Sequence, residues 1–232
     1  MPSDNAFPLH EACREGQIIR VKELIDEQPK LTLTKDLDSR YPIHWAVSYQ
    51  HEEIVNFLLS QMQTVDLDEL LDDSGWSALH IASSVGNLNI ITKLINHTIK
   101  PDVCLSTSRG ITALHLACSK QHVSVAQLLI EEGASVRQKD SRNQLPLHRA
   151  ASVGNVSLVE LLCLHKSPVN TKDVQGWTPL FHALSEGRGD VAVILVKTYN
   201  AEYRDLKDVY GKTPLDVVAD QKVKEYFMQN VE

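Results

Sequence analysis

The sequence predicts an all-α solenoid of seven helix-turn-helix repeats joined by hairpin fingers. Three observations predict it: a short motif centred on histidine that recurs at a near-constant period, a helix-ending column six residues after that histidine, and a turn signal before most copies. A helix pair of this kind buries its apolar face only against neighbouring pairs, so the repeats must stack.

The motif occurs as PLHEA from Pro8, PIHWA from Pro42, ALHIA from Ala78, ALHLA from Ala113 and PLHRA from Pro146. Two degenerate copies follow, TPLFHA from Thr178 and TPLDVV from Thr213, with Phe181 and Asp216 in the histidine column. Spacings within this column are 34, 36, 35, 33, 33 and 35 residues, which resembles the period of ankyrin repeats. We therefore expect one domain, 1–232, with repeats of about 1–35, 36–71, 72–106, 107–139, 140–172, 173–207 and 208–232.

Each element of the repeat has its own signal. Turn residues such as DDSGWS (72–77) and DVQGWT (173–178) predict the fingers. Thr followed by Pro opens the first helix, since Pro there gives up no helical hydrogen bond. Glycine then ends that helix at Gly16, Gly86, Gly154 and Gly187, and an apolar stripe, for example Ile19, Val21, Leu24 and Ile25, predicts the buried face of the second helix.

The terminal copies are expected to be caps. No finger precedes the first repeat, and the last repeat ends in the polar stretch VKEYFMQNVE after a partial second helix. A stack must stop exposing its interior at each end.

The histidines and cysteines are predicted to be structural. Copies of the histidine lie a whole repeat apart, too far to share one metal ion, so each imidazole is expected to brace the backbone of the adjacent hairpin. Cys13, Cys104, Cys118 and Cys163 form no CxxC pair and are expected to be reduced thiols, with Cys13 and Cys118 in the core. We expect no cofactor, no metal site and no catalytic residue.

Composition limits the partners. Lys and Arg number 23 against 30 Asp and Glu, and a net charge of −7 disfavours nucleic acid. No apolar run is long enough to span a bilayer, and the amino terminus lacks the features of a signal peptide. The expectation is a monomer in the cytoplasm and nucleus that binds proteins, with no membrane partner.

Positions around the finger and at the end of the first helix are expected to form the binding face. The candidate protein-binding residues are Asp38, Arg40, Trp45, Tyr49, Asp73, Trp76, Arg109, Lys120, Arg142 and Trp177. For Trp76 and Trp177 the alternative is that the indole covers the neighbouring finger and serves stability, and Trp45 is expected to be partly buried.

Charge is distributed unevenly along the chain. Residues 1–73 carry 15 acids and 6 bases, a balance of −9, whereas residues 74–232 carry 15 acids and 17 bases, a balance of +2. A partner with the reverse arrangement would be oriented by this pattern. The alternative is that the acidic surface serves solubility.

The fingers DLDSR (36–40) and DDSGW (72–76), the stretch CSK (118–120) and LHRAASVGN (147–155) resemble the gankyrin family over essentially the whole chain, most closely its fungal members. The resemblance implies a chaperone of proteasome regulatory-particle assembly. It would hold the C-terminal helical domain of an AAA ATPase subunit of the base on its concave face and hinder premature docking on the core particle.

In that family Arg40 and Lys120 match positions for acidic groups of the partner, and Asp38 and Asp73 match positions for its basic groups. Trp45 and Trp76 also match. Animal gankyrin carries an LxCxE-type stretch where this chain has Leu184, Ser185, Glu186 and Gly187, so retinoblastoma binding is not implied.

Two other classes of function fit the sequence less well. An inhibitor or adaptor of a cell-cycle kinase shares the fold, but such inhibitors usually have fewer repeats. An enzyme requires a cleft with converging reactive groups, and the sequence offers only the histidine column and solvated carboxylates.

Overall fold

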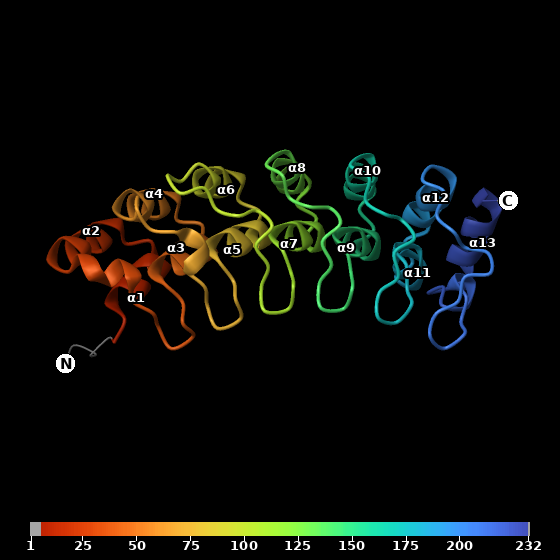
Figure 1. The fold of residues 1–232 in the computed structure, drawn as a ribbon, viewed down its shortest axis with the longest axis horizontal. Coiled ribbons are helices and arrows are strands. Elements are labelled where there is room, and N and C mark those ends of the chain that lie inside the picture. Colours follow the sequence, from red (N-terminus) through yellow and green to blue (C-terminus); the bar gives the residue numbers. More distant parts are fainter. Residues whose placement is uncertain (1–5, 232) are drawn as a thin grey trace. The chain divides into compact units, whose positions relative to one another are not determined.

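The fold is a series of helix pairs, each linked to the next by a hairpin-shaped loop. The computed structural model describes residues 6–231, and regular structure in that range is helical, without extended strands (Figure 1). The described helices group into two compact units, one ending at Arg109 and one beginning at Gly110. The predicted all-α class is confirmed. The first five residues of the amino terminus considered above lie outside the described range.

Unit 1 holds three pairs of α-helices and two short 3-10 helices. They are α1 (Pro8–Glu15), α2 (Ile18–Glu27), η1 (Pro29–Leu33), α3 (Pro42–Ser48), α4 (Glu52–Gln61), η2 (Leu67–Glu69), α5 (Ala78–Val85) and α6 (Leu88–Ile95). First helices pack on first helices and second helices on second, so α3 contacts α1 and α5 while α4 contacts α2 and α6.

Unit 2 repeats this two-layer packing. Its elements are α7 (Ala113–Ser119), α8 (Val123–Glu131), α9 (Pro146–Val153), α10 (Val156–Leu164), α11 (Pro179–Ser185), α12 (Gly189–Lys197), η3 (Pro214–Asp216) and α13 (Gln221–Val231). In each unit the fingers project on the side of the first helices, away from the second helices (Figure 1). The first helices and the fingers therefore share one accessible side within a unit.

The histidine column ties each helix start to the next repeat. The backbone N–H of Tyr41 donates to Nδ1 of His44 (3.3 Å), and Nε2 of His44 donates to the carbonyl oxygen of Leu70 (3.0 Å). The same bond to the following repeat joins His10 to Arg40, His115 to Gln144 and His148 to Thr171. A ring that accepts at Nδ1 and donates at Nε2 is neutral, and burial lowers the pKa of His44 to about 4. The structural interpretation of these histidines is confirmed.

The helix-ending column is also confirmed. Gly16, Gly86, Gly154 and Gly187 all have positive φ, and Gln50 and Gln121 take the same left-handed conformation in the repeats without glycine. The bond this turn makes is local: the N–H of Gly86 donates to the carbonyl of Ala82.

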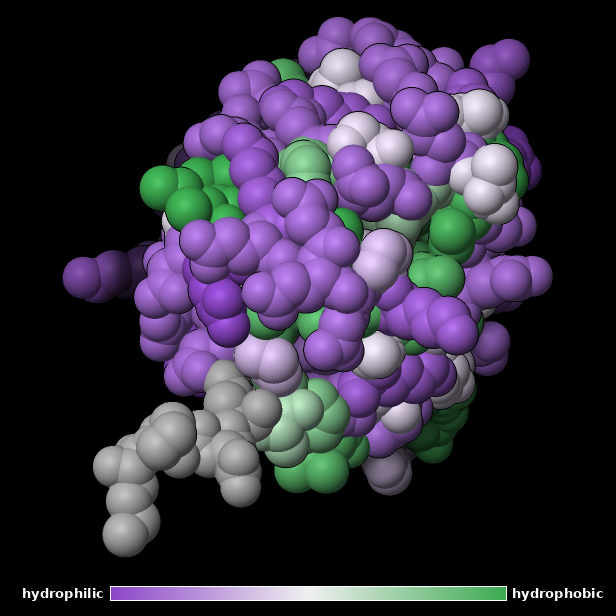
Figure 2. Space-filling model, turned by 90° about the vertical axis from the view of Figure 1, so that its left-hand side faces the viewer, coloured by the Kyte–Doolittle hydropathy of each residue, from purple (hydrophilic) through white to green (hydrophobic). Residues whose placement is uncertain are grey.

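The core consists of the facing sides of the two helix layers. Val21, Leu24 and Ile25 are buried as predicted, but Ile19 is 73% exposed, so its assignment to the buried face is wrong. Ile19 lies two positions before Val21, about 200° around α2, so it points away from the face that holds Val21, Leu24 and Ile25. The end of unit 1 formed by α1 and α2 is largely hydrophilic, with small apolar patches (Figure 2).

All four cysteines are thiols outside any disulfide, and Cys13 and Cys118 are completely buried. Burial raises the pKa of Cys13 and of Cys163 to about 12, which keeps both thiols protonated. Their predicted role as packing residues agrees with this.

The last repeat differs from the prediction. Its first helix is reduced to the 3-10 turn η3, whereas its second helix, α13, is eleven residues long. Asp216, in the histidine column, accepts the backbone N–H (2.8 Å) and the hydroxyl (2.7 Å) of Thr213 and so replaces the imidazole as a cap. Helix α13 packs on α12 and buries Phe227. The stack therefore ends in a complete second helix, not in the partial one predicted, and the first helix of the last repeat is the shortened one.

Replacing His115 by Ala should lower the free energy of unfolding by about 1 to 2 kcal/mol. The change removes the bond to the Gln144 carbonyl and leaves that oxygen without its donor. Chemical denaturation of the full chain measures the loss, with the exposed His165→Ala as control. A variant as stable as the parent protein would contradict the bracing role.

Candidate functional site

An aspartate at its first position organises each of five fingers. These aspartates are Asp36, Asp72, Asp140, Asp173 and Asp208. In each, Oδ1 accepts the backbone N–H groups two and four residues later, at 2.8 to 3.0 Å. The residue three positions later has positive φ and donates to the aspartate carbonyl. Local bonds therefore fix the finger before any partner arrives.

The second carboxylate oxygen receives a donor from the helix that follows. Nine residues after the aspartate, Trp45 donates to Asp36 (2.7 Å), Arg149 to Asp140 (2.6 Å) and His182 to Asp173 (3.0 Å). Where this ninth residue is apolar, the preceding finger reaches across instead. Trp177 donates to Asp208 (3.0 Å), and Arg40 lies 3.7 Å from Asp72. Side chains at these positions thus lock each finger onto its own helix or onto the next finger.

Backbone hydrogen bonds join the tips of neighbouring fingers. In unit 1 the N–H of Asp73 donates to the carbonyl of Asp38 (3.3 Å), and in unit 2 the N–H of Val174 donates to the carbonyl of Arg142 (3.0 Å). The two residues that follow each finger aspartate form the tip of that finger. Because neighbouring tips are hydrogen-bonded, these residues lie in a fixed row within a unit.

The predicted site residues divide into two groups. Those at exposed tips or helix ends are Asp38, Tyr49, Asp73 and Arg109 in unit 1 and Lys120 and Arg142 in unit 2. Those that are partly buried are Arg40, Trp45 and Trp76 in unit 1 and Trp177 in unit 2. Arg40, Trp45 and Trp177 hold finger aspartates, so a structural role accompanies any role in binding.

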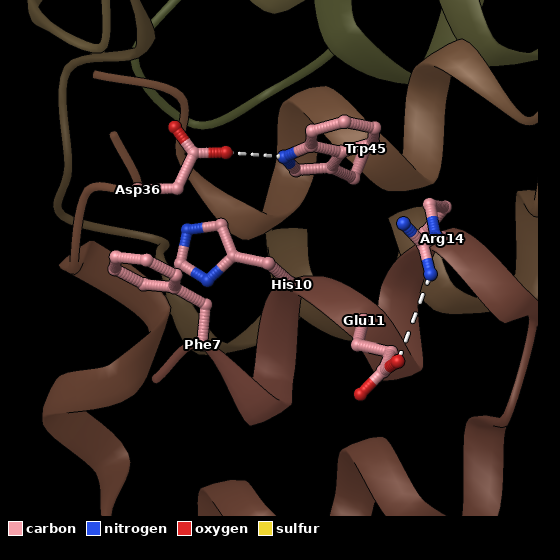
Figure 3. A pocket seen from close by; sticks show the side chains of 6 residues that line it. All are labelled: Phe7, His10, Glu11, Arg14, Asp36 and Trp45. Atoms are coloured by element: carbon pink, nitrogen blue, oxygen red, sulfur yellow. Dashed lines mark hydrogen bonds and ion pairs between the residues drawn. The ribbon is translucent and has the colours of Figure 1, made fainter. Parts of the chain in front are cut away.

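Unit 1 carries a hollow of about 180 Å³ between α1 and the finger 36–40 (Figure 3). Phe7, His10, Glu11, Arg14, Asp36 and Trp45 line it. The indole nitrogen of Trp45 points at Asp36, and Glu11 points at Arg14, 3.6 Å away (Figure 3). Burial would raise the pKa of Asp36, but its bonds from Trp45 and from the finger backbone outweigh that effect and hold the pKa below its usual range. The hollow thus keeps a charged carboxylate.

An aromatic row leads out of this hollow. The Arg40 guanidinium lies over the Trp45 ring (5.3 Å), Trp45 stacks on Tyr49 (6.2 Å), and Tyr49 stacks on His51 (6.4 Å). Tyr49 is 53% exposed. The Arg40 guanidinium and the exposed Tyr49 ring lie next to acidic finger tips. Arginine and aromatic side chains contribute much of the binding energy in protein–protein interfaces, so this region is suited to bind a protein partner.

Unit 2 carries a more polar hollow of about 280 Å³. Ser119, Arg142, Gln144, His148, Arg149, Ser152, Val153 and His182 line it. Within it Gln144 donates to Asp173 (2.8 Å), and Nε of Arg149 is buried without a hydrogen-bond partner. Arg149 and His182 were not among the predicted site residues. Their signal is the position nine residues after a finger aspartate.

Within residues 6–231 no three His, Cys, Asp or Glu side chains come together as an ion would require. None of the helices in this range combines the length and the apolarity needed to cross a membrane.

Replacing Trp177 by Phe should cost about 1 kcal/mol of unfolding free energy, because the ring survives while Asp208 loses a donor. Urea titration measures it. The matched change Tyr210→Phe, at an exposed tip, should leave stability unchanged. Equal stability of the two variants would show that the indole bond contributes nothing.

Comparison with known proteins agrees with this architecture. The ankyrin-repeat family profile, which spans three repeats, matches residues 9–103, 61–140, 100–173 and 147–227. The ankyrin-repeat domain of Bcl-3 superposes with a TM-score of 0.77 at 25% identity, covering 97% of this chain and all of that one.

Two sequence relatives come from yeasts. An ankyrin-repeat protein of Schizosaccharomyces pombe is 37% identical, over 57% of this chain and 55% of its own length. A protein of Saccharomyces cerevisiae described as a probable 26S proteasome regulatory subunit, p28, is 55% identical over 226 residues, which is 97% of this chain and 99% of that protein. The chain therefore belongs to the ankyrin-repeat proteins and, within them, to the gankyrin family.

Proposed function

We propose that this protein is an assembly chaperone of the proteasome regulatory particle. It binds the C-terminal helical domain of one AAA ATPase subunit of the base and, while bound, hinders premature docking of the base on the core particle. The proposal includes action in the cytoplasm and nucleus, by binding alone and without catalysis. The description of the 55% identical yeast relative as a proteasome regulatory subunit supports the setting.

The observation that carries the proposal is the row of exposed charges on the fingers of unit 1. Asp38 and Asp73 occupy neighbouring tips that a backbone bond joins, and both are exposed. Because the finger aspartates Asp36 and Asp72 already serve the finger backbone, the tip carboxylates are available for basic groups of a partner. Exposed Lys120 and Arg142 in unit 2 offer the opposite charge to acidic groups.

Calorimetric titration of the full chain with the purified C-terminal domain of each base ATPase subunit tests this. We expect one domain to bind in a 1:1 complex, and its affinity to fall as salt rises from about 50 to 500 mM, because screening weakens attraction between exposed charges. Binding of every domain with equal affinity, of none, or of a cell-cycle kinase in their place would overturn the proposal.

A further inference from the structure

The last two fingers of unit 2 end in exposed apolar side chains. Val174 is 54% exposed, Val209 63% and Tyr210 77%. Together with Gln175 they fill the two tip positions of the fingers 172–178 and 207–213, and they are called the distal tip patch below. Apolar side chains this exposed on neighbouring tips are unusual unless a partner covers them.

The distal tip patch is held in a fixed geometry. The N–H of Val209 donates to the carbonyl of Gln175 (3.1 Å), so the two tips lie side by side. Gly176 has φ +79°, and a Cβ at this position would lie 3.1 Å from the Cα of Asp208. The fingers therefore approach as closely as their backbones allow, and the patch is ordered before a ligand arrives.

The exposed charges within the two fingers are all positive, and the exposed acid Asp216, which follows the second finger, interacts with Lys212. Within 172–178 and 207–213 the bases are Lys172, Lys207 and Lys212, and each is exposed. Nζ of Lys172 lies 3.5 Å from the carbonyl oxygen of Lys207, which places this ammonium between the two fingers. The acids in these ranges, Asp173 and Asp208, are 6% and 8% exposed and accept the finger's own N–H groups. A chain of net charge −7 thus presents a basic, apolar surface here.

We propose that the distal tip patch binds an extended acidic protein segment whose apolar side chains pack on Val174, Val209 and Tyr210. Carboxylates of that segment would meet the three lysines. The tips of unit 1 also expose an apolar side chain, Leu37, but they carry Asp38 and Asp73, whose charge would repel the same segment. A single exposed aromatic ring gives no platform for successive bases, so a protein fits the patch better than single-stranded nucleic acid. The inference does not depend on the proposed function.

The test uses the ¹⁵N-labelled full chain and a blocked 12-residue peptide made of four Glu-Glu-Leu units. We expect saturable amide shifts confined to the fingers 172–178 and 207–213. Val209→Asp should weaken binding at least about tenfold, and so should the double variant Lys172→Glu with Lys207→Glu, because each removes one of the two contacts. Leu164→Asp, an equally exposed change on α10, should leave binding unaltered. The thermal midpoint of each variant checks folding.

Three further ligands decide between explanations. A Lys-Lys-Leu peptide and an all-Glu peptide should bind at least about tenfold more weakly. If either matches the Glu-Glu-Leu peptide, or if a 12-nucleotide single strand binds at these fingers more tightly than it, the inference is wrong. The absence of shifts, or shifts centred elsewhere, overturns it as well. Because Asp38→Lys with Asp73→Lys is expected to leave peptide binding intact, failure here and failure of the proposed chaperone role are distinguishable.

Discussion

Acidification from pH 7 to pH 4 should remove about 3 kcal/mol of unfolding free energy for each of His44 and His148. Burial lowers the pKa of both to about 4, against an ordinary value of 6.5. Above pH 6.5 neither the folded nor the unfolded chain protonates these rings. Between pH 6.5 and 4 the unfolded chain binds protons that the folded chain refuses, so stability falls through that window. Two such histidines together approach the whole stability of a typical domain.

The neighbouring ionisable groups act in the same direction. Burial also lowers the pKa of His115, and donors to Asp36 and Asp173 outweigh burial and hold the pKa of each carboxyl below its ordinary value. Stability that depends on those carboxylates is present above about pH 4 and disappears as the pH falls further. As the pH falls, protonation of the histidines should therefore destabilise the fold first, and protonation of the aspartates should destabilise it further.

Urea titrations at pH 7.5, 6.0, 5.0 and 4.5, followed by tryptophan fluorescence, measure the effect. The matched variant His44→Gln keeps a polar side chain but removes the titrating group. It should start less stable at pH 7.5 and lose less stability on acidification. If parent and variant lost the same amount of unfolding free energy between pH 7.5 and 4.5, protonation of His44 would not be the cause.

Features that recur in each repeat were predictable from sequence. Gly86 ends α5 through a bond to Ala82, and His44 braces Leu70, a backbone contact that any repeat of this type supplies. Exposure of Ile19 was predictable from helix geometry, because a residue two positions before Val21 lies about 200° around the helix, on the face opposite to the buried one. The short η3 escaped prediction, because Thr213 and Pro214 open it as in other repeats and its start carries no signal that it ends at Asp216.

The candidate site was predictable only in part. Tip positions such as Asp38 and Arg142 follow from counting along the finger, and both are exposed. What counting cannot reveal is that side chains nine residues onward return to the finger. Arg149 and His182 share the position nine residues after a finger aspartate, but the meaning of that position emerges only from the fold, which brings them to Asp140 and Asp173. The roles of the ten predicted residues in binding stay predictions.

Reversal of both tip carboxylates, Asp38→Lys with Asp73→Lys, should abolish binding of the ATPase C-terminal domain. Removing one side of a desolvated charge pair costs about 2 to 5 kcal/mol, so even one such pair lost weakens the complex at least about 30-fold. Both side chains are exposed, and the finger bonds are made by Asp36 and Asp72 instead, so the fold should survive. The association constant measured by calorimetry and the urea midpoint together separate loss of binding from loss of folding.

Matched controls locate the effect on the tips. Glu23→Lys with Glu27→Lys reverses as much charge on α2, on the layer of second helices, and should change affinity less than about threefold through long-range attraction alone. Replacing the basic residues of the partner by acidic ones should restore part of the affinity for the Asp38→Lys, Asp73→Lys protein. The same altered partner should bind the parent protein more weakly than the unaltered partner does. If the reversed protein bound like the parent at about 50 mM salt, the acidic tips would serve solubility and the partner would dock elsewhere.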